Sequence, residues 1–127
     1  MIADSSVWVD FARANVTPQV LALRRAITTR TAMTTDVVRL EVLSGETGVD
    51  RLAAALHSCE DVMQLPRVDV EDAAQIYRMC RRAGKTIRSL NVCLIAAIAI
   101  RNDVAVLHRD RDFDAIARHF PLRVVTE

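Results

Sequence analysis

Along the chain, short runs of apolar or β-branched residues alternate with longer segments in which apolar positions recur at helical spacing. The short runs, predicted to be strands, are residues 1–4, 31–35, 62–65, 104–107 and 122–125. The predicted helices are residues 6–14, 18–27, 36–45, 47–58, 69–84, 89–102 and 112–119. Because helices separate single strands, the pattern predicts an α/β fold in which helices cover both faces of a short central parallel sheet.

Polar residues mark where the two long helices in the second half of the chain begin. Asp69, with Asp72 three positions later, is predicted to be a capping pair for the first of them. Ser89 is predicted to cap the second, whose sequence SLNVCLIAAIAI has Asn91 as its only polar side chain after the serine. A helix that is apolar on all sides belongs in the interior, so this segment is predicted to be a core helix.

The chain has 127 residues, of which 51% are hydrophobic, so we expect residues 1–127 to form a single domain around one core. A net charge of +1 excludes a polycation that would coat nucleic acid. The charge is uneven, since eleven of the seventeen basic residues follow residue 66. Five of them crowd together: Arg78, Arg81, Arg82, Lys85 and Arg88. This cluster is either a solvated helix face or a surface that contacts phosphates.

Cysteine usage and hydropathy favour a soluble protein of the cytoplasm. Cys59, Cys80 and Cys93 are odd in number and widely spaced, which argues against a disulfide framework or a zinc site. The first residues lack the basic segment and apolar core of a signal peptide. The longest apolar run, residues 92–100, is nine residues long, whereas about 20 are needed to cross a bilayer. We therefore expect no membrane contact.

Four acidic residues follow the ends of predicted strands. Asp4 ends the first strand, Asp110 and Asp112 follow the fourth, and Glu41 lies in the helix that leaves the second. Because the carboxyl ends of parallel strands meet at one edge of a sheet, these side chains can gather there. Clustered carboxylates raise each other's proton affinity unless a cation lies among them. Mg²⁺ and Mn²⁺ prefer such oxygen ligands, so a metal site is the simplest functional interpretation.

Each of these acids also has a purely structural interpretation. Asp4 is placed to cap a helix, Asp110 to occupy a turn, Asp112 to cap the last helix, and Glu41 to lie on an exposed helix face. Patterning alone leaves both interpretations open.

Three segments carry a more specific signal: MIADSSVWVDF at residues 1–11, VVRLEVLSG at residues 37–45 and RRAGKTIRSLNVCLIAAIAIRNDVAVLHRDRDF at residues 81–113. Together they resemble the PIN-domain ribonuclease toxins of VapC type over essentially the whole chain. That family has an acid followed by Ser or Thr after the first strand, a Glu before a Ser-Gly segment, an Asp opening a core helix, and a D-x-D-F loop. The matching residues here are Asp4 with Ser5 and Ser6, Glu41, and Asp110 with Asp112. The resemblance implies a PIN-like fold with helices on both faces of the sheet.

One element of that family pattern is absent. Similar members carry an aspartate at the position of Val92. The helix that contains this position leads into the fourth strand from its carboxyl end, so its first turn should face the acidic crevice. Asn91 is not a simple substitute, because neighbouring side chains on a helix point about 100° apart and an amide carries no charge.

The resemblance implies a Mg²⁺- or Mn²⁺-dependent endoribonuclease that leaves a 5′-phosphate and a 3′-hydroxyl. In these terms Asp4 and Asp110 are the principal metal ligands. Glu41 is a further ligand or the group that orients the attacking water, and Asp112 is an outer ligand. Ser6 supports the site by a hydrogen bond to Asp4 or to a water.

The resemblance also implies partners. A homodimer and a cognate VapB-type antitoxin, whose tail blocks the acidic crevice, are expected. Because the chain has few aromatic residues on which bases could stack, the expected substrate is a structured RNA such as a tRNA or a ribosomal RNA. The residues expected to contact phosphates are Arg88, Arg109 and Arg111.

Val92 removes one expected ligand, and losing such a group commonly lowers a catalytic rate by several powers of ten. We therefore predict a folded protein with impaired RNA cleavage. Two alternatives remain open: a catalytically inactive pseudo-nuclease that binds antitoxin or RNA, and an enzyme in which Asn91 or a water fills the gap. A receiver-like signalling domain fits less well, because the only lysine, Lys85, precedes the core helix.

Overall fold

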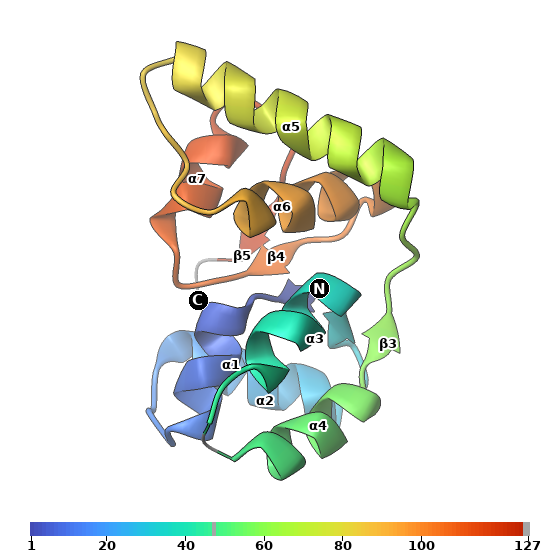
Figure 1. Ribbon diagram of the computed structural model, residues 1–127. Coiled ribbons are helices and arrows are strands. Elements are labelled where there is room, and N and C mark those ends of the chain that lie inside the picture. Colours follow the sequence, from blue (N-terminus) through green and yellow to red (C-terminus); the bar gives the residue numbers. More distant parts are fainter. Residues whose placement is uncertain (47, 126–127) are drawn as a thin grey trace.

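Five short strands form one sheet in the computed structural model, which describes residues 1–46 and 48–125 (Figure 1). They are β1 (Ile2–Ala3), β2 (Met33–Thr34), β3 (Glu60–Asp61), β4 (Val106–Leu107) and β5 (Val124–Val125), in the order β3-β2-β1-β4-β5. Every pairing among these strands is parallel, and β1 is central, with Ile2 opposite Met33 on one side and Val106 on the other. The predicted parallel sheet is confirmed.

Seven helices in the described part of the chain connect the strands. They are α1 (Ser5–Ala12), α2 (Pro18–Thr28), α3 (Asp36–Leu43), α4 (Val49–His57), α5 (Pro66–Arg82), α6 (Leu90–Asn102) and α7 (Arg111–Ala117). Figure 1 shows α5, α6 and α7 together on one side of the sheet and α1, α2 and α4 on the other. Helix α3 contacts both α1 and α6. The α/β prediction with helices on both faces is therefore confirmed. None of these helices is both long and apolar enough to span a membrane.

Helix α6 is buried on nearly all sides. Its buried side chains are Val92, Cys93, Ile95, Ala96, Ala97, Ile98 and Ala99. It packs most extensively against α5 and also contacts α3 and α7. Trp8 of α1 and Phe113 of α7 are the largest fully buried side chains of the same core. Since a helix without a polar face has nothing to present to water, its central position follows from its sequence.

The connection between β3 and α5 differs from the prediction. The expected strand at residues 62–65 is wrong, because β3 lies at Glu60–Asp61 and only the Val62 N–H extends the ladder, donating to the Thr34 carbonyl at 2.9 Å. Pro66 occupies the first turn of α5, where its missing N–H costs little. The helix consequently begins three residues before Asp69.

Asp69 is therefore not the N-cap residue of α5, which is Leu65, and the predicted capping pair with Asp72 is wrong. Its carboxylate accepts the Leu65 N–H at 2.8 Å. It also accepts two hydrogen bonds from Arg101, near the end of α6, at 2.7 and 2.9 Å. This pairing spans 32 positions and leaves no local pattern from which it could be predicted.

Other element ends also shift. Helix α7 begins at Arg111 with Asp110 as its N-cap, so the structural role considered for Asp112, that of the cap, belongs to Asp110. Ser89 lies at the N-cap position of α6, but its side chain makes no capping hydrogen bond. Strand β5 is shorter than predicted. The predicted helix start at residue 47 lies outside the described residues.

Candidate active site

A pocket of about 370 Å³ lies at the carboxyl edge of the sheet. Asp4 reaches it from the end of β1, Asp110 from the loop after β4, and Glu41 from α3, which follows β2. The first turn of α6 contributes Ser89 and Val92 to its wall. Three of the four acids expected from the sequence thus line one pocket.

Asp4 is both a helix cap and a pocket residue. Its Oδ2 accepts the Ser6 N–H at 3.0 Å and the Ser6 hydroxyl at 2.6 Å, which fixes the start of α1. The side chain is buried, with 4% of its surface exposed. Burial raises the pKa of Asp4 above its usual value, the Ser6 bonds offset part of that rise, and the charge of Asp110 adds to it. The structural interpretation of Asp4 as a helix cap is therefore confirmed, and the cap leaves the same carboxylate in the wall of the pocket.

Glu41 lies half-buried on α3. Its Oε2 accepts a 3.4 Å hydrogen bond from the Asn91 amide, while Oε1 is buried and has no hydrogen-bond partner among the described residues. Burial raises the pKa of Glu41, the Asn91 bond lowers it in part, and the charge of Asp4 raises it further. A buried carboxylate oxygen without a partner is an available ligand or proton acceptor.

Asp110 is fixed by two contacts at the start of α7. Its Oδ1 accepts the Asp112 N–H at 3.0 Å, and its own N–H donates to His108 Nδ1 at 3.1 Å. Arg88 Nη2 lies 3.6 Å from the same Oδ1. Asp110 therefore contributes its carboxylate to the pocket from a rigid turn.

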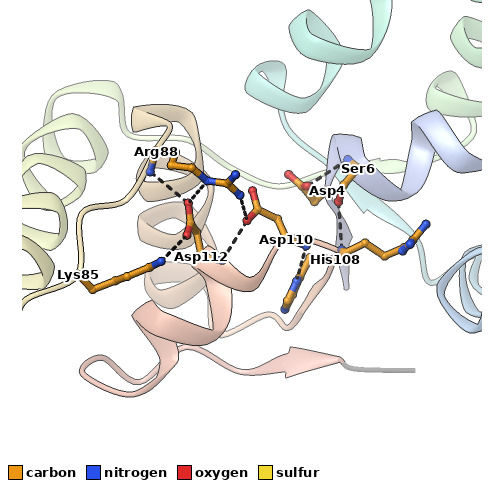
Figure 2. Close-up of polar contacts among 8 residues, drawn as sticks. Asp4, Ser6, Lys85, Arg88, His108, Asp110 and Asp112 are labelled. Carbon is orange, nitrogen blue, oxygen red and sulfur yellow. Dashed lines mark hydrogen bonds and ion pairs between the residues drawn. The ribbon is translucent and has the colours of Figure 1, made fainter.

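Asp112 does not line the pocket. Its buried carboxylate accepts the Arg88 N–H at 3.1 Å, and Lys85 Nζ and Arg88 Nε both lie 3.5 Å from it. Figure 2 shows Asp112 between these two cations, with Asp110 next to them and Asp4 with Ser6 on the far side of Asp110. Burial alone would raise the pKa of Asp112, but the Arg88 backbone bond and the Lys85 charge outweigh it and hold this pKa below its usual value.

Val92 forms an apolar part of the pocket wall. It lies in the first turn of α6, is 6% exposed, and shares the pocket with Asp4, Glu41 and Asp110. Asn91 bonds to Glu41 and is not among the residues that line the pocket. Position 92 thus offers a hydrocarbon surface to three carboxylates.

Arg109 and Arg111 lie on the other side of the Asp110 turn. The Arg109 N–H donates to the Ser6 hydroxyl at 3.1 Å, and its guanidinium pairs with Asp10 in the pocket wall. Arg111 lines a neighbouring pocket that also includes Asp110. Sequence reasoning missed Asp10, although its position four residues after Ser6 places both on one helix face.

The donor chemistry of the pocket fits Mg²⁺ or Mn²⁺. Carboxylate oxygens are the ligands these ions prefer. Burial is the main reason why the pKa values of Asp4 and Glu41 are raised, and neither carboxylate has an ion-pair partner among the described residues. Across the same residues, no group of three or more acidic, histidine or cysteine side chains forms a ready-made metal site. The pocket therefore supplies suitable oxygen ligands, but their positions do not form a ready-made coordination site for one ion.

Comparisons with known proteins agree with this architecture. Residues 1–119 match the family model of the PIN domain. The chain is 39% identical over 128 residues to Ribonuclease VapC11 of Mycobacterium tuberculosis and to VapC ribonuclease Mb1587 of Mycobacterium bovis, covering 93% of this chain and 92% of each relative. It also resembles a chain in the crystal structure of VapBC2 from Rickettsia felis bound to a DNA fragment from their promoter. That match has a TM-score of 0.68 and 14% identity, over 98% of this chain and 96% of the other.

Proposed function

The chain belongs to the PIN-domain family and, within it, to the VapC ribonucleases, and from this premise we propose that it is the toxin of a VapBC-type toxin–antitoxin system. Its activity is the hydrolysis of RNA phosphodiester bonds with the help of a divalent metal ion. The observation that supports this best is the convergence of Asp4, Glu41 and Asp110 on one pocket at the carboxyl edge of the sheet.

Asp4, Glu41 and Asp110 are the residues that would hold Mg²⁺ or Mn²⁺. Such an ion, when bound, supplies charge stabilisation on the phosphate and a water activated for attack. The protein contributes rigid placement, because Ser6 fixes Asp4 and the α7 cap fixes Asp110. Glu41 Oε1, which is buried without a partner among the described residues, is the atom available to accept a proton from the attacking water.

Arginines around the pocket provide the positive charge that an RNA backbone requires. Arg109 is held in the pocket wall by Asp10, Arg88 lies beside Asp110, and Arg111 lies in the neighbouring pocket. Contacts from these groups to phosphate oxygens would orient the strand for cleavage into a 5′-phosphate and a 3′-hydroxyl.

The proposal includes an impaired activity, because Val92 offers no oxygen at the position where the family pattern has an aspartate. The test is Mg²⁺-dependent cleavage of RNA by the chain and by its Val92→Asp variant. We expect the variant to be faster by at least about 100-fold. Val9→Asp is the matched control, since Val9 is another apolar side chain of the same pocket and an acid there should restore nothing. Equal and robust cleavage by the chain and by Val92→Asp would contradict the proposal.

A second candidate function is that of a pseudo-nuclease that binds antitoxin or RNA without cutting. The apolar wall at Val92 and the engagement of Glu41 by Asn91 favour it. Calorimetric titration with Mn²⁺ separates the two functions. Binding at micromolar concentrations by the chain itself favours an impaired enzyme, whereas binding that appears only after Val92→Asp favours the pseudo-nuclease.

The proposal extends to partners and location. A VapB-type antitoxin would cover the acidic pocket with its tail, and an arginine of that tail would complement the carboxylates of Asp4, Glu41 and Asp110. Residues 1–127 would act as one PIN domain in a cytoplasmic homodimer, with a structured RNA such as a tRNA or ribosomal RNA as substrate. Copurification with the antitoxin, followed by light scattering of the separated toxin, tests the assembly.

A further inference from the structure

Asp112 is the acid of the D-x-D-F loop that the pocket does not use. Its side chain is 1% exposed and points toward the loop between α5 and α6, which carries Lys85 and Arg88. A carboxylate buried this deeply needs a positive or hydrogen-bonding partner. Asp112 has three such contacts. Oδ2 faces the Arg88 N–H and the Arg88 guanidinium, and Oδ1, which makes no hydrogen bond among the described residues, faces the Lys85 ammonium at 3.5 Å.

The two cations differ from Asp112 in exposure. The side chains of Lys85 and Arg88 are 44% and 73% exposed, so each is partly open to solvent while it contacts the buried carboxylate of Asp112. Arg88 also reaches Asp110, with Nη2 3.6 Å from Oδ1. Arg88 therefore lies at the rim of the pocket, beside the carboxylate of Asp110, and Lys85 lies farther out, on the other side of Asp112.

The exposed cations at this rim can receive an anion. The two positive charges of Lys85 and Arg88 are matched by the carboxylates of Asp112 and Asp110, but both cationic side chains remain partly open to solvent. A backbone phosphate has the charge and the oxygen geometry to complete such a pair, since a guanidinium binds two oxygens at once and an ammonium acts as a point charge. A phosphate beside the scissile one would reach this rim while the scissile group occupies the pocket.

We propose that Asp112 is a positioning residue rather than a metal ligand, and that Lys85 and Arg88, which it orients at the rim of the pocket, bind an RNA phosphate adjacent to the scissile one. The inference rests on the proposed function, because it assumes that RNA enters the pocket. It assigns Asp112 to substrate binding and leaves metal binding to Asp4, Glu41 and Asp110.

RNA binding can be measured on the chain as it stands, in EDTA, where no cleavage occurs. The probe is a fluorescently labelled tRNA, followed by anisotropy between about 50 and 200 mM KCl. We expect Lys85→Gln and Arg88→Gln each to weaken binding about 3- to 10-fold and to lower the salt slope by about 1. Arg82→Gln is the matched control, since Arg82 is exposed and lacks an ion-pair partner among the described residues, and it should bind like the parent.

Asp112→Asn separates orientation from simple charge. The substitution removes a negative charge, so an electrostatic effect alone would tighten RNA binding. We expect binding to weaken instead. In a protein that already carries Lys85→Gln and Arg88→Gln, Asp112→Asn should weaken binding no further, because Asp112 acts through these two cations. In the Val92→Asp background, Asp112→Asn should leave Mn²⁺ affinity within about twofold, whereas Asp110→Asn should abolish Mn²⁺ binding.

The outcomes separate this inference from the proposed function. A parent chain that binds neither tRNA nor ribosomal RNA at low salt overturns the proposed function itself. A parent that binds while Lys85→Gln and Arg88→Gln bind equally well overturns the rim site. A loss of Mn²⁺ affinity in Asp112→Asn as large as that in Asp110→Asn makes Asp112 a metal ligand and overturns its positioning role. Thermal melting of each variant shows that the comparison is between folded proteins.

Discussion

Carboxylates with little exposure lie near both ends of helix α6, but they differ in whether they have a cationic partner. Near the C-terminal end, Asp69 is held by two hydrogen bonds from Arg101, at 2.7 and 2.9 Å. Burial alone would raise the pKa of Asp69, but the Arg101 bonds outweigh it and lower this pKa. Near the N-terminal end, Asp4 and Glu41 have no ion-pair partner among the described residues, and their pKa values are raised.

The difference distinguishes a structural carboxylate from one available for chemistry. Arg101 also donates to the Met63 carbonyl at 2.6 Å, so the neutralised pair ties the end of α6 to the segment before α5. At the other end the charges remain uncompensated, which costs folding stability but leaves oxygens free for a ligand. Asp112 is intermediate, because its charge is compensated by cations that themselves face solvent.

The largest effect should come from breaking the neutralised pair. Arg101→Met keeps the apolar stem but leaves the buried charge of Asp69 alone, and losing one partner of a buried pair costs about 3 kcal/mol or more. The free energy of unfolding, measured with urea, checks this. Arg123→Met is the control, because the Arg123–Asp103 pair is exposed and should cost less than about 1 kcal/mol. Equal losses in the two variants would mean that Asp69 is not the charge that matters.

A smaller loss of stability is expected at the N-terminal end of α6, where the substitution adds a charge instead of removing the partner of one. Val92→Asp adds a carboxylate to a pocket that already holds Asp4, Glu41 and Asp110 besides the Arg109-paired Asp10, so the metal-free variant should lose about 1 to 2 kcal/mol of unfolding free energy. Saturating Mn²⁺ should restore that loss, because a ligand that binds only the folded state stabilises it. Melting curves with EDTA and with Mn²⁺ test this. A metal-free Val92→Asp protein that melts higher than the parent would contradict the idea of uncompensated charge.

The two ends of α6 were not equally predictable from the sequence. Parallel strands end at one edge of the sheet, which places Asp4, Glu41 and Asp110 together. Position 92 is expected at the same edge because α6 leads into β4 from its carboxyl end, so this end follows from periodicity and topology. The Asp69–Arg101 pair does not, because it joins side chains 32 positions apart whose contact depends on how α5 packs against α6. For the same reason, the sequence did not predict that the Asp112 side chain points toward Lys85 and Arg88, because these residues belong to another segment.

The two ends also predict opposite pH dependences. A carboxyl whose pKa is raised by folding, such as Asp4, costs stability when ionised, and this cost disappears as the pH falls through the folded pKa toward the usual value of 3.8. A carboxyl whose pKa is lowered, such as Asp69, contributes stability at neutral pH. That contribution is lost as the pH falls from the usual value of 3.8 through the folded pKa.

Asparagine substitutions convert this contrast into a measurement. Asn caps a helix as well as Asp does, so Asp4→Asn removes the charge while the start of α1 is kept. We expect the unfolding free energy of the metal-free variant to be about 1 kcal/mol higher than that of the parent at pH 8. This difference should shrink as the pH is lowered. The unfolding free energy of Asp69→Asn should be lower than that of the parent at pH 8, and this deficit should also shrink as the pH is lowered. If both variants lie below the parent at pH 8 by similar amounts, then Asp4 is a structural carboxylate like Asp69, and the unpaired charge in the pocket is not what sets it apart.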